Sequence, residues 1–205
     1  LDGDFLDVVL MKAKTFGFKH VKIKVDAKNP SVQVNRVRKI LGDEIEIRVD
    51  ANCSWNRNNA PAFFKDLAEL GVVSVEQPLP SDDLEGCVNL RGKGLMLITL
   101  DESASSVSAV NHIASLGACD VINVRISKCG GLLGSLRMIE AATEKGLKIQ
   151  LGAQVGESCI LTAAGAHLAS GISSFLWREG CFGKYLLKNG LCKSELQFSS
   201  GGKFY

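Results

Sequence analysis

The chain alternates between short runs of aliphatic and β-branched residues and longer segments in which apolar residues recur every three or four positions. Short apolar runs are typical of buried strands, and the longer spacing is typical of helices with one apolar face. The helical spacing is clear at Phe63, Phe64, Leu67 and Leu70. Strands are predicted at residues 21–25, 45–49, 72–75, 95–100, 121–126, 147–151 and 172–176.

Turn-forming residues separate these elements. Pro61 follows Asn58 and Asn59, which predicts a helix that begins near Pro61 with an asparagine cap. A glycine just before a strand fits the left-handed turn that ends a helix. The glycines in such places are Gly17, Gly42, Gly71, Gly117, Gly146 and Gly171.

The alternation of helix and strand predicts a parallel α/β sheet with helical crossovers, either doubly wound or closed into a barrel. Strand ends recur about every 26 residues without a dinucleotide-type glycine fingerprint, so the uniform period favours a TIM-type (β/α) barrel. The pattern opens on a helix and predicts seven strands, so the first strand of an eight-stranded barrel is expected to be missing. We assign residues 1–184 to the barrel and residues 185–205 to a C-terminal tail outside the repeat.

Charged residues follow the predicted strands with the same period. They are Lys24, Asp50, Glu76, Asp101 and Lys128, each about 26 residues from the next. A single acidic residue at a strand end is ordinarily a helix cap, and an isolated Lys-x-Lys is ordinarily part of a solvated strand. Five charged residues in register are hard to obtain from capping, and the catalytic groups of such barrels lie at this rim. We therefore predict a functional site there.

The acidic members of this set predict a metal site. Three carboxylates that converge on one point repel one another unless a cation lies between them. Oxygen ligands without His or Cys suit a hard ion, so we predict Mg²⁺, before Mn²⁺ or Ca²⁺, at Asp50, Glu76 and Asp101. Lys22 and Lys24 share one strand face because side chains alternate, and that face is expected to point into the barrel.

The composition excludes several classes of protein. Of the 205 residues, 46% are hydrophobic and 22% are charged, so the chain can bury a sizeable core and is not expected to be disordered. The net charge of +2 is spread along the chain, unlike the basic stripe of a nucleic-acid binder. No apolar run is long enough to cross a bilayer and no signal-peptide pattern is present, so we expect a cytoplasmic protein that does not bind membranes.

The cysteines are scattered and contain no CxxC pair. A zinc site or a disulfide framework needs closer or more regular spacing. We expect reduced and mostly buried thiols. The seven cysteines are Cys53, Cys87, Cys119, Cys129, Cys159, Cys181 and Cys192.

Five short motifs at the predicted rim resemble the enolase superfamily, specifically its muconate-lactonizing branch. They follow the order and spacing of that branch and extend over most of the chain. The motifs are Lys22-Ile23-Lys24, Asp50-Ala51-Asn52, Glu76-Gln77-Pro78, Asp101-Glu102-Ser103 and Lys128-Cys129-Gly130-Gly131. The resemblance implies the superfamily's modified barrel. Enzymes of the family also carry an N-terminal capping domain, which we expect to be absent from this chain and toward which the tail at residues 185–205 would pack.

The resemblance also implies roles for individual residues. Mg²⁺ would be bound by the three carboxylates named above. Lys24 and Lys128 would be the acid/base catalysts on opposite faces of the substrate, and Lys22 would support Lys24 and contact the substrate carboxylate. Asn52 and Glu102 would support the metal ligands from behind.

The last predicted strands bear on the substrate. The mandelate-racemase branch has a histidine after its seventh barrel strand, whereas residues 152–157 contain none, so that branch is disfavoured. Dipeptide epimerases of the resembled branch usually carry Asp-x-Asp at the eighth strand, where this chain has Trp177-Arg178-Glu179. Arg178 and Glu179 either contact substrate or form a salt bridge at the rim. The predicted substrate contacts are Gln154, Glu157, Arg178 and Glu179.

These inferences predict an enzyme that removes a proton α to a carboxylate and stabilises the resulting enediolate with a metal. A racemase or epimerase of an amino-acid or dipeptide-like substrate is the first hypothesis. A cycloisomerase, or a dehydrating lyase such as an o-succinylbenzoate synthase, is the second, and an inactive fragment or scaffold is the third. We expect a small-molecule carboxylate as substrate, no nucleic-acid partner, and a homo-oligomeric parent protein.

Overall fold

The structure is a computed structural model that describes residues 3–181, 183, 187, 191–192, 196 and 199–202. The chain divides into two compact units. The first comprises Leu1–Thr99 with Ser199–Lys203, and the second comprises Leu100–Phe198 with Phe204–Tyr205. Most of the predicted tail at residues 185–205 lies outside the described residues.

The first unit repeats a helix and a parallel strand. Its elements are α1 (Gly3–Phe16), β1 (His20–Lys24), α2 (Pro30–Leu41), β2 (Glu46–Asp50), α3 (Ala60–Glu69), β3 (Val72–Glu76), α4 (Leu84–Arg91), the greater part of β4 (Leu97–Leu100), and the short η1 (Ser200–Gly202). The strands pair in sequence order. Lys24 lies opposite Asp50, Asp50 opposite Glu76, and Glu76 opposite Thr99. This register brings the charged ends of β1, β2 and β3 into one row.

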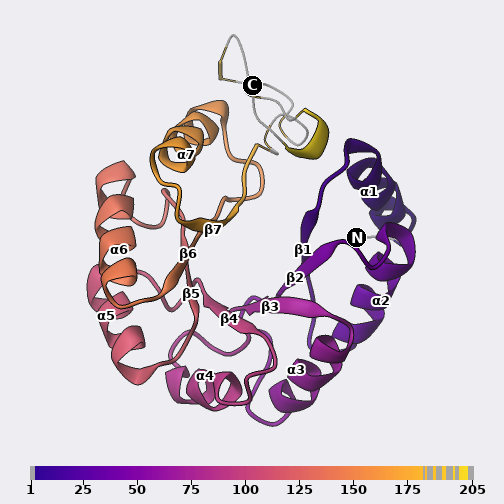
Figure 1. Cartoon of the computed structure of the whole chain (residues 1–205), viewed down its shortest axis with the longest axis horizontal. Coiled ribbons are helices and arrows are strands. Elements are labelled where there is room, and N and C mark those ends of the chain that lie inside the picture. Colours follow the sequence, from indigo (N-terminus) through magenta and orange to yellow (C-terminus); the bar gives the residue numbers. More distant parts are fainter. Residues whose placement is uncertain are drawn as a thin grey trace. The chain divides into compact units, whose positions relative to one another are not determined.

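Helices α1 to α4 all lie against the same face of these strands (Figure 1). The apolar stripe of α2 places Val34 and Val37 in the core, and α3 contributes Phe64 and Leu67, all fully buried. Ile47 of β2 is also fully buried. The helices therefore cover the aliphatic face of the strands.

The second unit continues the repeat. Its elements are α5 (Val107–Leu116), β5 (Val121–Val124), α6 (Leu132–Glu144), β6 (Lys148–Leu151), α7 (Cys159–Gly171) and β7 (Phe175–Arg178). The three strands are parallel and in sequence order, with Val124 opposite Leu151 and Leu151 opposite Arg178. All residues of β5 are buried, as expected for a strand of a parallel sheet. No helix in the described part of the chain is both long and apolar enough to cross a membrane.

The seven predicted strands are all present, with ends that differ from the predicted ones by at most three residues. The largest shift is at the last strand, which begins at Phe175 because residues 172–174 form the turn that follows α7. Five of the six predicted helix-ending glycines have positive φ angles, whereas Gly171 is still helical. Asn59 precedes α3 but makes no capping bond through its side chain, so the prediction of an asparagine cap was wrong in that detail.

The cysteine prediction needs one correction. Cys159 at the start of α7 and Cys192 form a disulfide across a separation of 33 residues. The other five cysteines are thiols, of which Cys87, Cys119 and Cys181 are buried. The pair was missed because spacing in the sequence does not reveal which distant cysteines meet.

The turn between β5 and α6 is tightly folded. The backbone N–H groups of Lys128 and Cys129 both donate to the carbonyl of Arg125, at 3.0 and 2.9 Å. Gly131 has φ +92° and donates to the carbonyl of Ile126. A Cβ atom on Gly134 would lie 1.8 Å from the carbonyl oxygen of Cys129. The first turn of α6 therefore needs a glycine where it passes this loop.

Gly134→Ala should destabilise the chain by about 1–3 kcal/mol, because its methyl group overlaps backbone that cannot rotate away. Gly165→Ala is the matched control, since Gly165 is also helical and its added Cβ meets nothing within 4 Å. The control should be stabilised by about 0.5–1 kcal/mol through the lost freedom of the unfolded chain. Urea denaturation followed by circular dichroism measures both changes, and equal stability of the two variants would contradict the prediction.

Candidate active site

Two buried carboxylates lie side by side in the first unit. Asp50 ends β2 and Glu76 ends β3, and the register places them opposite each other. Their side chains are only 6% and 4% exposed. Burying two anions together is costly, so cationic neighbours are needed.

Lys22 supplies one such neighbour. Its Nζ donates to Glu76 Oε2 at 2.9 Å and lies 4.0 Å from Asp50 Oδ2. Lys24, two residues on, donates to the side-chain oxygen of Asn52 and lies 3.7 Å from Asp50 Oδ2. The Lys24 side chain is 65% exposed, so its amino group is accessible from outside.

The surroundings of Asp50 disfavour the ionised form of its carboxyl group. Its pKa is raised to about 6, mainly by burial and next by the negative charge of Glu76. Lys22, the backbone N–H of Asn52 and Lys24 act in the opposite direction but do not cancel the effect. A further positive charge beside Asp50 and Glu76 would thus stabilise their ionised forms.

The turns after β2 and β3 hold these side chains in place. Asn52 and Cys53 have φ angles of +43° and +60°, and Gln77 has +37°. The backbone N–H of Asn52 donates to Asp50 Oδ1 at 3.0 Å, and that of Cys53 donates to the carbonyl of Gln77 at 2.8 Å. Left-handed backbone at non-glycine residues is unfavourable, and it often occurs at functional sites. The sequence suggested Asn52 as a supporting residue but gave no sign of strain at Gln77.

The second unit carries another carboxylate with cationic partners. Asp101 follows β4 and is 3% exposed. Arg125, which follows β5, grips it with both arms of the guanidinium, from Nε to Oδ1 at 3.0 Å and from Nη2 to Oδ2 at 2.7 Å. Arg125 was missed in the sequence, where the only available signal was a second basic residue three positions before Lys128.

Lys128 is fully engaged. Its Nζ donates to Asp101 Oδ1 at 2.8 Å, to the backbone carbonyl of Asp101 at 2.7 Å and to that of Asn123 at 2.8 Å. An ammonium group has three protons, and each has an acceptor here. Lys128 therefore holds Asp101 against β5, and its amino group is less free than that of Lys24.

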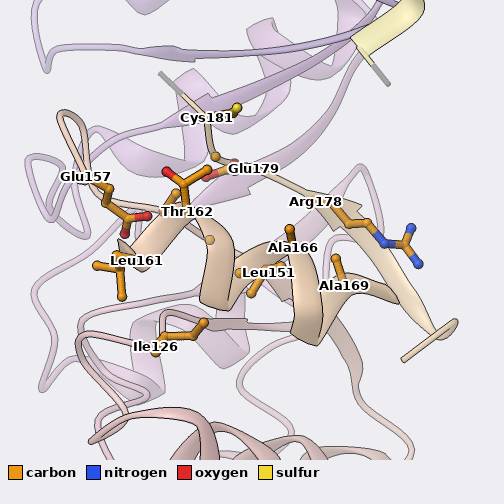
Figure 2. A pocket seen from close by; sticks show the side chains of 14 residues that line it. Ile126, Leu151, Glu157, Leu161, Thr162, Ala166, Ala169, Arg178, Glu179 and Cys181 are labelled. Carbon is orange, nitrogen blue, oxygen red and sulfur yellow. The ribbon is translucent and has the colours of Figure 1, made fainter. Parts of the chain in front are cut away.

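A small hollow, open to solvent, lies between α7 and the ends of the strands of the second unit. Figure 2 shows Glu157, Thr162 and Glu179 around it, with Ile126 and Leu151 on its apolar side. Burial raises the pKa of Glu157, which the backbone N–H of Gln154 and the charge of Arg125 partly oppose. The hollow is thus mainly apolar with two carboxylates at its edge.

The four predicted substrate contacts have different surroundings. Glu157, Arg178 and Glu179 line the hollow, and Gln150 Nε2 approaches Glu179 at 3.4 Å. The side chain of Gln154 is exposed. Arg178 extends away from the carboxylates in Figure 2, and it donates to the carbonyls of Ile172, Ser173 and Phe175 at the start of its strand. These bonds brace the start of β7, and substrate contact by Arg178 stays a prediction.

The predicted metal ligands fit a hard cation chemically. Among the described residues, no three His, Cys, Asp or Glu side chains gather into a ready metal cluster. The structure brings Asp50 and Glu76 together in the first unit and places Asp101 in the second. Burial and the negative charge of Glu76 raise the pKa of Asp50, and a nearby divalent ion would oppose both effects. Carboxylate oxygens are also the ligands that Mg²⁺ prefers. Glu102, the other predicted supporting residue, is half-buried next to Asp101 in the sequence.

Solved structures share this fold. The dipeptide epimerase from Enterococcus faecalis V583, complexed with Mg and the dipeptide L-Leu-L-Tyr, is 25% identical and matches 98% of this chain and 57% of its own with a TM-score of 0.90. The α/β fold of the TIM-type barrel class, predicted from the 26-residue period, is thus confirmed.

Sequence relatives point the same way. N-succinyl-L-Arg/Lys racemase of Bacillus cereus is 31% identical over 156 residues, which cover 75% of this chain and 42% of that enzyme. Muconate cycloisomerase 1 of Rhodococcus opacus is 32% identical over 202 residues, covering 97% of this chain and 53% of that enzyme. The chain spans about half the length of the relatives it matches. The model of the enolase C-terminal domain-like family matches residues 7–203, and the chain belongs to that family, in the muconate-lactonizing branch of the enolase superfamily.

Proposed function

We propose that this chain carries the machinery for removing a proton α to a carboxylate, in a racemase or epimerase of amino-acid or dipeptide-like substrates. The observation that carries the proposal is the accessible amino group of Lys24 beside the buried pair Asp50 and Glu76. Relatives named as racemases and epimerases support the substrate class. A carboxylate substrate is the partner that this chemistry requires.

The three carboxylates Asp50, Glu76 and Asp101 would hold Mg²⁺, with Mn²⁺ as the alternative ion. The ion would supply the positive charge that stabilises an enediolate as the α-proton leaves. Lys22 adds a fixed positive charge next to Glu76 and keeps that carboxylate oriented. Asn52 fixes the end of the Lys24 side chain through its amide oxygen.

Lys24 would be the base that takes the proton. It is accessible, and the acceptor of its hydrogen bond is a neutral amide, which leaves the other positions on the amino group open to substrate. In an epimerase Lys128 would return a proton to the opposite face. Release of Lys128 from its three acceptors would then have to accompany the reaction.

The bonding of Lys128 favours a second candidate function, cycloisomerisation with a single base. A lysine whose protons are all engaged is suited to stabilise charge without exchanging a proton. Muconate and chloromuconate cycloisomerases are among the relatives. Lys24 would then act alone as the acid/base group.

The hollow in the second unit would receive the rest of the substrate. Its walls include Ile126 and Leu151, which suit an apolar side chain, and its edge carries Glu157 and Glu179. Two carboxylates beside an apolar wall suit a substrate that ends in a cationic group, such as an ammonium. Gln154 holds the loop, since its backbone N–H donates to Glu157 Oε1 at 2.6 Å.

Incubation of N-succinyl amino acids and dipeptides in deuterated water tests the proposed function. An epimerase should exchange the α-hydrogen for deuterium and invert the centre, and both changes are followed by NMR and chiral chromatography. Conversion of a muconate to its lactone with deuterium entering at the α-carbon, and no inversion of the amino-acid substrates, would instead establish the second candidate. Failure of every carboxylate to exchange would contradict both.

Substitution of the two lysines separates the one-base and two-base mechanisms. Lys24→Ala should lower turnover by about a hundredfold or more in either case. With two bases, Lys128→Ala should also abolish inversion but leave α-proton exchange from one stereoisomer, because one base serves each face. Lys65→Ala, which removes only an exposed helix pair with Glu69, is the control and should retain full activity. Inversion at near-parent rates in both site variants would exclude the assigned roles.

The stability of the chain should depend on pH through Asp50. The folded-state pKa is about 6 and the unfolded value 3.8, so the native state binds more protons between them. Stability should therefore fall as pH rises through that window, and the loss should persist above it. Asp50→Asn should stabilise the chelator-treated chain at pH 8 by on the order of 2 kcal/mol, measured by urea denaturation.

Asp83→Asn is the opposite control. Arg57 holds the pKa of Asp83 below its usual value, so this carboxylate contributes stability at pH 8 that its amide cannot supply. The control should therefore be destabilised at pH 8. An Asp50→Asn variant that is less stable than the parent at pH 8 would show that the buried pair is not under electrostatic stress.

A further inference from the structure

The contact between Arg125 and Asp101 differs in geometry from the contacts that lysines make in the candidate site. Arg125 approaches in a two-armed fork, with Nε to Oδ1 at 3.0 Å and Nη2 to Oδ2 at 2.7 Å. Lys128 adds a third contact, to Oδ1 at 2.8 Å. Both oxygens of this buried carboxylate are thus bonded to cations, and Oδ2 is bonded by Arg125.

The fork is also a strong competitor for those oxygens. Paired charged hydrogen bonds from a planar guanidinium are among the strongest side-chain contacts, and they are strengthened where water is excluded. The side chain of Asp101 is 5% exposed and that of Arg125 is 17% exposed. By contrast, the ammonium group of Lys22 is not a planar fork, and its Nζ donates to Glu76 Oε2 at 2.9 Å.

Arg125 has a second carboxylate within electrostatic reach. Its charge acts on Glu157, which lines the hollow beside α7. A guanidinium displaced from Asp101 therefore has another anion nearby to receive it. Arg125 connects a predicted metal ligand with the wall of the predicted substrate hollow.

We propose that Arg125 competes with the divalent cation for Asp101 and so sets the metal affinity of the site as a positioning residue. The inference rests on the proposed function, in which Asp101 is a metal ligand. A cation that binds Asp101 must either displace Nη2 from Oδ2 or accept a unit positive charge a few ångströms away. Both lower its affinity, and the first also releases Arg125 toward Glu157.

Magnesium titration by calorimetry tests the competition in the parent chain, Arg125→Met and Arg125→Lys. Arg125→Met should bind Mg²⁺ at least about tenfold more tightly, because one nearby unit charge is worth that much or more at a partly buried site. Arg125→Lys keeps the charge but loses the fork, so its gain should be smaller. Arg36→Met is the matched control, since Arg36 forms the same fork with Asp7 at 2.8 and 2.9 Å, and its affinity should equal the parent's.

Thermal unfolding supplies a readout that does not depend on activity. With a chelator, Arg125→Met should melt below the parent, because Asp101 has lost its partner. With saturating Mg²⁺ its melting temperature should rise by more than the parent's, in line with the tighter binding.

Unchanged or weaker Mg²⁺ binding in Arg125→Met would overturn the inference and show that the fork only braces Asp101. If Arg125→Met does not fold, the same result in Arg125→Lys would overturn it. Absence of Mg²⁺ and Mn²⁺ binding in the parent and every variant would overturn the metal chemistry of the proposed function, and this inference with it. Parent binding thus distinguishes the two failures.

Discussion

The candidate site depends on one constraint, which is that the carboxylates buried at its strand ends need positive charge and hydrogen-bond donors around them. Removing an anion from water is costly unless cations and hydrogen bonds replace its hydration. Asp50 and Glu76 meet this requirement incompletely through Lys22, and the pKa of Asp50 rises as a result. Asp101 meets it more fully, through a guanidinium and an ammonium. The two units therefore present carboxylates in different electrostatic states.

The helix-and-strand repeat explains why these groups can be held at all. Parallel strands covered by helices bury most of their side chains, and the side chain of each buried carboxylate in the first unit, Asp50 and Glu76, belongs to the last residue of its strand. Tight turns then fix its direction, as the left-handed Asn52 and Cys53 do after β2. Lys24 differs from these buried side chains, because its amino group is exposed and a substrate can reach it. Fixed carboxylates at Asp50 and Glu76 and an accessible amino group at Lys24 together suit proton abstraction.

The sequence was sufficient for properties that depend on period. Strand number, the helix-ending glycines and the row of Lys24, Asp50 and Glu76 follow from a repeat of about 26 residues, because each unit solves the same packing problem. Contacts between residues far apart in the chain could not be predicted from the sequence. The fork of Arg125 on a carboxylate 24 positions earlier, and the link between Cys159 and Cys192, depend on tertiary geometry that no local pattern encodes.

The register between β1, β2 and β3 has a consequence for how such a chain can change length. Because side chains alternate along a strand, insertion or deletion of one residue near the start of Glu46–Asp50 would turn the side chains that follow it to the other face. Asp50 would then face the helices, and the aliphatic residues would face the row of charges. A length change in the turn that precedes β2 would leave both faces intact. Insertions and deletions should therefore accumulate in the turns between the elements, whereas a strand can be retained or lost only as a whole.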